Sequence, residues 1–164
     1  TNNWGVLFEY ESTLNTYTVK VNLGEAPGGN SPRNSLALGS TGKYYGTAIG
    51  AGTNNAGVIF EYDHLANTYT KKYDFNSADG ASPTSAMIDP GNGKLYGTAS
   101  SGGANGAGVI YEYDPSTSTY TKKFDFSDYD GAAPVGTLAK AAKDRGEIEV
   151  GDKISIGGVT GTVE

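Results

Sequence analysis

Cysteine is absent from this 164-residue sequence, and methionine, tryptophan and histidine occur once each. Without cysteine the chain forms no disulfide, and it offers neither a thiolate to a metal nor a thiol nucleophile to a substrate. Long apolar runs are also missing, because no stretch approaches the roughly 18 apolar residues of a membrane-spanning helix. These absences exclude a small disulfide-stapled scaffold and predict no membrane span.

Basic residues are few as well. The sequence has 12 Lys and Arg against 18 Asp and Glu, which gives a formal net charge of -6 at pH 7. Nucleic-acid binding relies on clustered basic side chains that neutralise phosphates. The charge balance therefore argues against nucleic acid as a partner.

Glycine and tyrosine are abundant, with 25 and 12 residues. This composition favours many short strands joined by tight turns over long amphipathic helices. We therefore expect an all-β protein in which helix is scarce.

One phrase occurs three times, as GVLFEYE, GVIFEYD and GVIYEYD, beginning at residues 5, 57 and 108. A second phrase follows each copy and places Tyr17, Tyr69 and Tyr120 about 51 residues apart. A third phrase carries Pro32, Pro83 and Pro134, each followed by Leu36, Met87 or Leu138. A fourth, GKYYGTA or GKLYGTA, occurs only twice. Four phrases in one order with one period indicate a tandem repeat.

Each phrase has the length and composition of one β-strand, so each repeat predicts four strands. In GVIFEYD, Val58, Phe60 and Tyr62 fall on one face of the strand, whereas Ile59 falls on the other. Apolar residues on both faces suit a blade that packs between two neighbours. The polar segments 63–67 and 114–118 are expected to be hairpin turns. The predicted fold is a β-propeller-like array of four-stranded blades that forms an incomplete ring in a single chain.

The stretch GKLYGTASSGGANGAGVIYEYDPSTSTYTKKFDF resembles Kelch-type blades. It is more similar to the GloVer tandem repeat of bacterial surface proteins, whose unit carries LYGT, a GG-containing loop, G-V-aromatic and DG-x-x-P. These elements correspond here to residues 95–98, 102–103, 108–111 and 130–134. The second strand ends in YGT rather than in the glycine doublet of Kelch blades, so Kelch partners are not carried over. The resemblance implies a secreted or cell-surface bacterial protein with a propeller-like fold, and it implies no reaction.

The repeat register ends at Leu138, where residues 139–164 replace the expected GKLYGTA phrase. We therefore divide the chain into propeller-type repeats over 1–138 and a divergent tail over 139–164, which is either a cap or a fusion. The run 139–143 favours helix but is too short to stand alone. The alternating stretches EIEV and KISI predict strands. This segment resembles the β-hairpin of the small barrel domain in small-conductance mechanosensitive channels, although the chain lacks the membrane helices of a channel.

Few side chains suggest chemistry. His64 lies in a turn without the partners that a catalytic or metal-binding histidine needs. Glu9, Glu61 and Glu112 recur in register, and we interpret them as structural, pairing with Lys72 or Lys123 across a hairpin. No catalytic residue and no cofactor are predicted.

Two groups of residues are candidates for binding. Asn54, Asn55 and Asn105 lie in glycine-rich loops, and their amides could bind the hydroxyls of a sugar. Asp125, Asp128 and Asp130 cluster before a glycine, but the spacing does not match an EF-hand because Phe126 occupies a ligand position. They are candidates for Ca²⁺, although no metal site is predicted outright.

Three functions follow from these patterns. The first is a non-catalytic extracellular module that is structural or presents rim loops to a protein or glycan. The second is a carbohydrate-active enzyme that uses carboxylates such as Asp79 and Asp130, separated by roughly 5 to 10 Å across one cleft. The third assigns the function to the tail, with the repeats as a carrier. Near-identical copies favour the first, because a general acid and a general base need different environments.

The chain holds strands three and four of one blade, two complete blades and strand one of another. Propellers usually close with four to eight blades. Either the chain is an excerpt of a longer propeller, or two copies complete a ring as a homodimer, with EIEV or KISI replacing the missing second strand.

Overall fold

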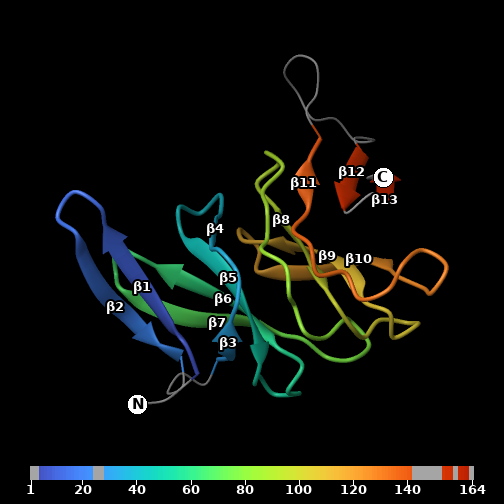
Figure 1. The fold of residues 1–164 in the computed structure, drawn as a ribbon, viewed down its shortest axis with the longest axis horizontal. Helices are drawn as coiled ribbons and strands as arrows, with labels where there is room; N and C mark the ends of the chain where they lie inside the picture. Colours follow the sequence, from blue (N-terminus) through green and yellow to red (C-terminus); the bar gives the residue numbers. More distant parts are fainter. Residues whose placement is uncertain (1–3, 24–27, 142–152, 157–158, 163–164) are drawn as a thin grey trace.

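The computed structural model describes residues 4–23, 28–141, 153–156 and 159–162. It contains thirteen strands and, within those ranges, no α-helix, which confirms the all-β fold (Figure 1). The strands are β1 (Val6–Glu11), β2 (Thr16–Asn22), β3 (Asn30–Pro32), β4 (Ala37–Leu38), β5 (Tyr44–Gly50), β6 (Val58–Asp63), β7 (Thr68–Asp74), β8 (Leu95–Ala99), β9 (Val109–Asp114), β10 (Thr119–Asp125), β11 (Ala139–Lys140), β12 (Lys153–Ile156) and β13 (Val159–Thr162).

The strands form separate antiparallel sheets that follow the chain, and none of them closes on itself. The first sheet is β1-β2, the second is β3-β5-β6-β7 with β4 also on β5, the third is β8-β9-β10, and the fourth is β11-β12-β13. Figure 1 shows the first three in chain order across the molecule, with the fourth above the third. The two ends of the array lie on opposite sides of this view.

The predicted hairpin turns are confirmed at both 63–67 and 114–118. In the first three sheets a tyrosine on one strand lies opposite a tyrosine on the next, as in the pair Tyr62 and Tyr69. Asn67 ends its turn in the left-handed conformation, with φ 52°, and accepts a 2.8 Å hydrogen bond from Tyr62. Asparagine tolerates this conformation better than most residues, which explains its place in the turn.

The first strand of each repeat is shorter and less regular than the sequence predicts. In the second sheet it is split into β3 and β4, and in the third sheet it is reduced to isolated bridges at Ala81 and Ile88. The residues before the three prolines, Ser31, Ser82 and Ala133, all have φ between 52° and 57°. A left-handed residue followed by a proline, which has no N–H to donate, interrupts a ladder of hydrogen bonds.

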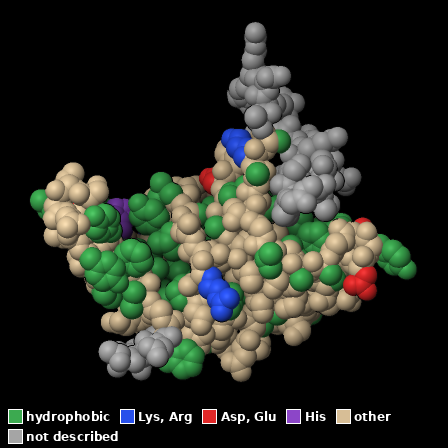
Figure 2. Space-filling model, viewed as in Figure 1, with side chains coloured by type: hydrophobic (Ala, Val, Ile, Leu, Met, Phe, Trp, Pro, Cys, Tyr) green, Lys and Arg blue, Asp and Glu red, His purple; other side chains and the backbone are tan. Residues whose placement is uncertain are grey.

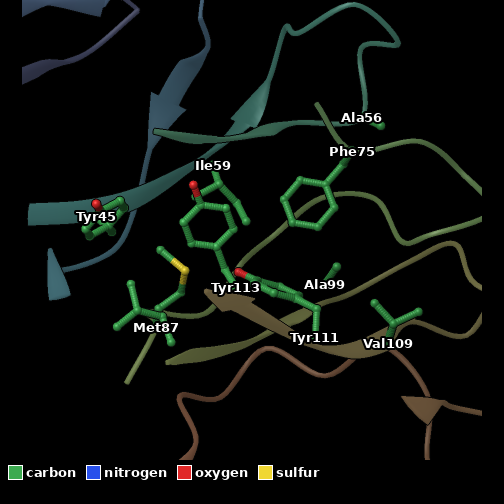
Figure 3. Close-up of a cluster of buried hydrophobic side chains, with 10 residues drawn as sticks. Tyr45, Ala56, Ile59, Phe75, Met87, Ala99, Val109, Tyr111 and Tyr113 are labelled. Atoms are coloured by element: carbon green, nitrogen blue, oxygen red, sulfur yellow. The ribbon is translucent and has the colours of Figure 1, made fainter. Parts of the chain in front are cut away.

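Successive sheets pack face to face through apolar side chains. One cluster joins the second and third sheets and includes Tyr45, Phe75, Tyr111 and Tyr113 (Figure 3). Another joins the first and second sheets and includes Val58, Phe60 and Tyr62. Since Ile59 belongs to the cluster with the third sheet, the apolar residues on the two faces of β6 serve two different interfaces, as the sequence predicts.

All three strands of the fourth sheet lie in the tail, and the first of them, β11, follows Leu138 directly. Ala139 pairs with Ser155, as Ala37 pairs with Tyr45 in the second sheet. The KISI stretch, β12, therefore lies beside β11, which has the place of the first strand of a repeat. This is the place that the second strand of a repeat occupies in the second and third sheets. The predicted helix-forming run begins instead with β11, and its last two residues, like EIEV, lie outside the described residues.

Candidate functional site

The most distinctive polar feature is a carboxylate cluster on the second sheet. Glu61 is buried on β6 and accepts a 2.6 Å hydrogen bond from the hydroxyl of Tyr45 and a 2.9 Å bond from Lys43 Nζ, both on or next to β5. Lys72 approaches the same carboxylate at 3.6 Å from β7. Side chains from three strands thus converge on one charge.

The third sheet repeats this cluster. Glu112 accepts hydrogen bonds of 2.7 Å from Tyr96 and 2.9 Å from Lys94, and Lys123 lies 3.8 Å away. The predicted cross-hairpin pairs with Lys72 and Lys123 are therefore present, but the shorter contacts come from the other neighbouring strand. The sequence analysis did not identify the lysine and tyrosine of the neighbouring strand as partners. The signal was the GK-x-Y motif, which precedes Glu61 and Glu112 at the same distance.

The surroundings keep the buried glutamates ionised. Burial by itself raises the pKa of Glu61, but the hydrogen bonds from Tyr45 and Lys43 and the charge of Lys72 outweigh burial and hold this pKa below its ordinary value. The same balance lowers the pKa of Glu112. Burial and the hydrogen bond to Glu112 raise the pKa of Tyr96 to about 12. A glutamate with a lowered pKa is a poor general acid near neutral pH.

The equivalent glutamate of the first sheet lacks the β5-type partners. Glu9 on β1 has 61% of its side chain exposed, against 9% for Glu61 and for Glu112. Its ion pair is with Lys20 at 3.4 Å across the hairpin. Of the described strands only β2 pairs with β1, so no Lys-x-Tyr strand lies beside Glu9.

The glycine-rich loops are tied to their own sheets by side chains of the repeat. Asp74 accepts a 2.9 Å bond from the Thr53 amide, and Asp125 accepts a 2.7 Å bond from the Ala104 amide. Each loop also carries an asparagine that donates to a backbone carbonyl 21 residues away. The two loops therefore have the same internal support.

The structure assigns contacts to the predicted sugar-binding asparagines. Asn54 donates to the carbonyl of Phe75, and Asn105 donates to that of Phe126, each at 3.0 Å. Asn55 is exposed and has φ 53°. Asn54 and Asn55 lie on the loop of the second sheet and Asn105 on that of the third, so they divide between two loops.

The predicted Ca²⁺ candidates are not brought together as a group. Among the residues that the structure describes, no three His, Cys, Asp or Glu side chains gather closely enough to hold a metal ion. Asp125 supports its loop and pairs with Lys122 at 3.0 Å, whereas Asp130 accepts a hydrogen bond from Ser127 within its own turn. Asp128 is exposed.

The other carboxylate and the histidine of the sequence analysis also have local contacts. Asp79 accepts hydrogen bonds from Tyr73 at 3.1 Å and from Asn76 in its turn. The ring of His64 packs edge-on against Tyr44, with centroids 5.4 Å apart. Both residues therefore help to hold turns in place.

These observations define an all-β tandem-repeat protein whose shared polar side chains bond within and between its sheets. The Gloeobacter/Verrucomicrobia repeat matches residues 1–149, and the chain belongs to this family. The match confirms the GloVer resemblance and runs past Leu138. No curated protein matches the chain. No helix in the described ranges is long and apolar enough to cross a membrane.

Proposed function

We propose that this chain is a non-catalytic module of a secreted or cell-surface bacterial protein, built from the blades of a β-propeller. It acts as a scaffold that presents its glycine-rich loops to a protein or glycan. The observation that carries this proposal is the equivalence of the copies: Glu61 and Glu112, and likewise Asn54 and Asn105, make the same contacts. A catalytic centre normally departs from such symmetry.

The junctions between sheets support a blade-like, Kelch-like arrangement. At each junction the residue before the proline donates its amide to the carbonyl of the residue two positions before β1, β6 or β9. The proline packs against the glycine that lies between this residue and the strand. The pairs are Ser31 to Trp4, Ser82 to Ala56 and Ala133 to Ala107, at 2.8 to 2.9 Å. Repetition of the same junction between successive sheets is what a ring of equivalent blades requires.

A glycan array tests the proposed binding, with detection of the intact, labelled chain. A matched variant replaces Thr53 by Ala and Asn55 by Gly, which gives the second loop the Ala-Asn-Gly sequence of residues 104–106. We expect this variant to fold normally and to bind a different set of glycans, because the second loop then presents the side chains of the third. Hydrolysis of a glycan that is abolished by Asp79→Asn or Asp130→Asn would contradict the proposal and restore the enzyme hypothesis.

For the isolated chain we propose a homodimer that completes the array head to tail. The outer face of the first sheet exposes Phe8, Tyr10 and Tyr17, each by more than half, and Figure 2 shows hydrophobic side chains gathered at that end. In the segment between β10 and β11, Tyr129 and Val135 are exposed. Exposed apolar patches of this kind mark interaction surfaces.

Light scattering measures this assembly directly. We expect a discrete species near twice 17.0 kDa, and Tyr17→Ser should shift it toward the monomer. A monomer that persists at high concentration would rule out the homodimer without affecting the proposed binding function.

A further inference from the structure

The outer edge of β1 differs from the equivalent edges of β6 and β9. In the second sheet, β6 is paired on one side by β7 and on the other by β5, and in the third sheet β9 lies between β10 and β8. In the first sheet, β1 is paired by β2 alone among the described strands. An unpaired edge presents N–H and C=O groups that can accept an added strand.

The two complete sheets specify which strand fits this edge. In both of them the added strand reads Lys-x-Tyr-Gly-Thr-Ala, and its tyrosine lies directly opposite the glutamate: Tyr45 opposite Glu61 and Tyr96 opposite Glu112. The lysine and the tyrosine hydroxyl then bind the two carboxylate oxygens. Glu9 occupies the same position on β1 and has a largely exposed carboxylate.

The glycine of this pattern has its own steric reason. Gly46 lies opposite Phe60, and a Cβ at Gly46 would stand 2.5 Å from the Phe60 ring. Gly97 lies opposite Tyr111 in the same way, with a Cβ 2.5 Å from the hydroxyl. The aromatic residue on β6 or β9 therefore requires a glycine opposite it on β5 or β8.

The receiving surface of β1 already has the required shape. Phe8 packs on Tyr17 with centroids 5.1 Å apart and planes at 32°, and Phe60 packs on Tyr69 at 5.0 Å and 32°. The aromatic pair thus has the same geometry without the added strand as with it. Little ordering remains to be done on binding, which favours affinity.

We propose that β1 binds, by strand addition, the Lys-x-Tyr-Gly-Thr-Ala strand of another repeat of this family. Both copies of that strand within this chain, β5 and β8, are already paired. The tail strand β12 is a poor substitute, because its register places Ser155 at the tyrosine position and Ile156 at the glycine position. This edge is separate from the glycine-rich loops of the proposed function.

The test uses the full chain and a fluorescent peptide of residues 93–100, GKLYGTAS, followed by polarisation. We expect saturable binding that weakens about fivefold or more when the peptide carries Tyr96→Phe, Lys94→Met or Gly97→Ala. Glu9→Gln in the protein should weaken binding by a similar factor, because charge-assisted hydrogen bonds are among the stronger ones.

Two controls separate this site from other open edges. Glu61→Gln, with folding checked by circular dichroism, should leave peptide binding unchanged, as should the loop variant with Thr53→Ala and Asn55→Gly. A peptide of the tail, GDKISIGG from residues 151–158, should bind much more weakly. Equal binding of the tail peptide, insensitivity to Glu9→Gln, or no saturable binding at millimolar peptide would each overturn the proposal.

Discussion

The hydroxyl of Tyr45 donates a 2.6 Å hydrogen bond to Oε2 of the buried Glu61, across the central strands of the second sheet. The same pair of residue types recurs in the third sheet. A buried carboxylate is costly unless it is paired and hydrogen-bonded, and here strands on both sides supply its partners. The charged carboxylate of Glu61 is therefore stable in its buried position only when β5 and β7 lie beside β6.

This arrangement predicts that the protein loses stability in acid. Because the folded-state pKa values of Glu61 and Glu112 lie below the ordinary value of 4.5, the unfolded chain takes up protons first as the pH falls. The resulting stabilisation is fully present above about pH 4.5 and is lost as the pH drops through the folded pKa values. Urea unfolding between pH 7 and pH 3 measures it.

The matched variant for this prediction is the double substitution Glu61→Gln and Glu112→Gln. It should cost about 1 to 3 kcal/mol per site at pH 7, the usual cost of disturbing a buried charged hydrogen bond, and should flatten the pH dependence. Glu9→Gln, at an exposed position, should change neither. An unaltered acid transition in the double variant would show that other groups control it.

The repeat and its strands could be predicted because they depend on local pattern. The alternation of Val58 and Ile59 and the polar turn at 63–67 are visible within a few residues, and the structure confirms them. The left-handed φ of Ser82 was not predictable, since the sequence indicates the proline but not the conformation before it. This conformation accompanies contacts with the segment before β6, where Ser82 donates its amide to the Ala56 carbonyl and Pro83 lies against Gly57.

The polar partners were not predicted, because the recurring GK-x-Y motif does not by itself show which strands lie side by side. Pairing of Lys43 with Glu61 requires knowing that β5 lies beside β6, and the bond from Asn54 reaches Phe75, 21 residues away. Residue type alone suggested that Asn54 was free to bind a sugar. Only the fold shows that its amide already has a partner.

Asn105→Ala is predicted to act on stability through its loop. Loss of the 3.0 Å bond to the Phe126 carbonyl should lower the free energy of unfolding by about 1 kcal/mol. Asn55→Gly should be neutral or slightly stabilising, because Asn55 has φ 53° and Gly106 occupies the equivalent place. Thermal unfolding measures both. A large loss with Asn55→Gly and none with Asn105→Ala would reverse these assignments.

Tyr111→Phe should leave stability unchanged or raise it. The hydroxyl of Tyr111 is buried and finds no hydrogen-bond partner among the described residues, and the other two copies carry Phe8 and Phe60 at this position. Removing an unpaired buried hydroxyl removes its desolvation cost. Urea unfolding at neutral pH decides the point, and a loss above about 1 kcal/mol would reveal an interaction of the hydroxyl.

Tyr120 and Tyr17 are equivalent in sequence but not in surroundings, which allows a matched test of packing between sheets. Tyr120 stacks on Tyr73 with centroids 4.1 Å apart and planes at 4°, and it also donates a hydrogen bond to the backbone carbonyl of Asp79. Tyr69 donates in the same way to Gly28. By contrast, Tyr17 is 58% exposed.

We therefore expect Tyr120→Ala to cost about 2 to 4 kcal/mol, because it removes an aromatic ring that joins two sheets. Tyr17→Ala should cost much less, since its ring contacts Phe8 within its own sheet. The free energies of unfolding should be compared at a protein concentration low enough to keep both variants monomeric, because association would stabilise the wild-type surface around Tyr17. Equal losses at the two positions would mean that the ring acts within each hairpin, and that packing between sheets contributes little to the stability of the array.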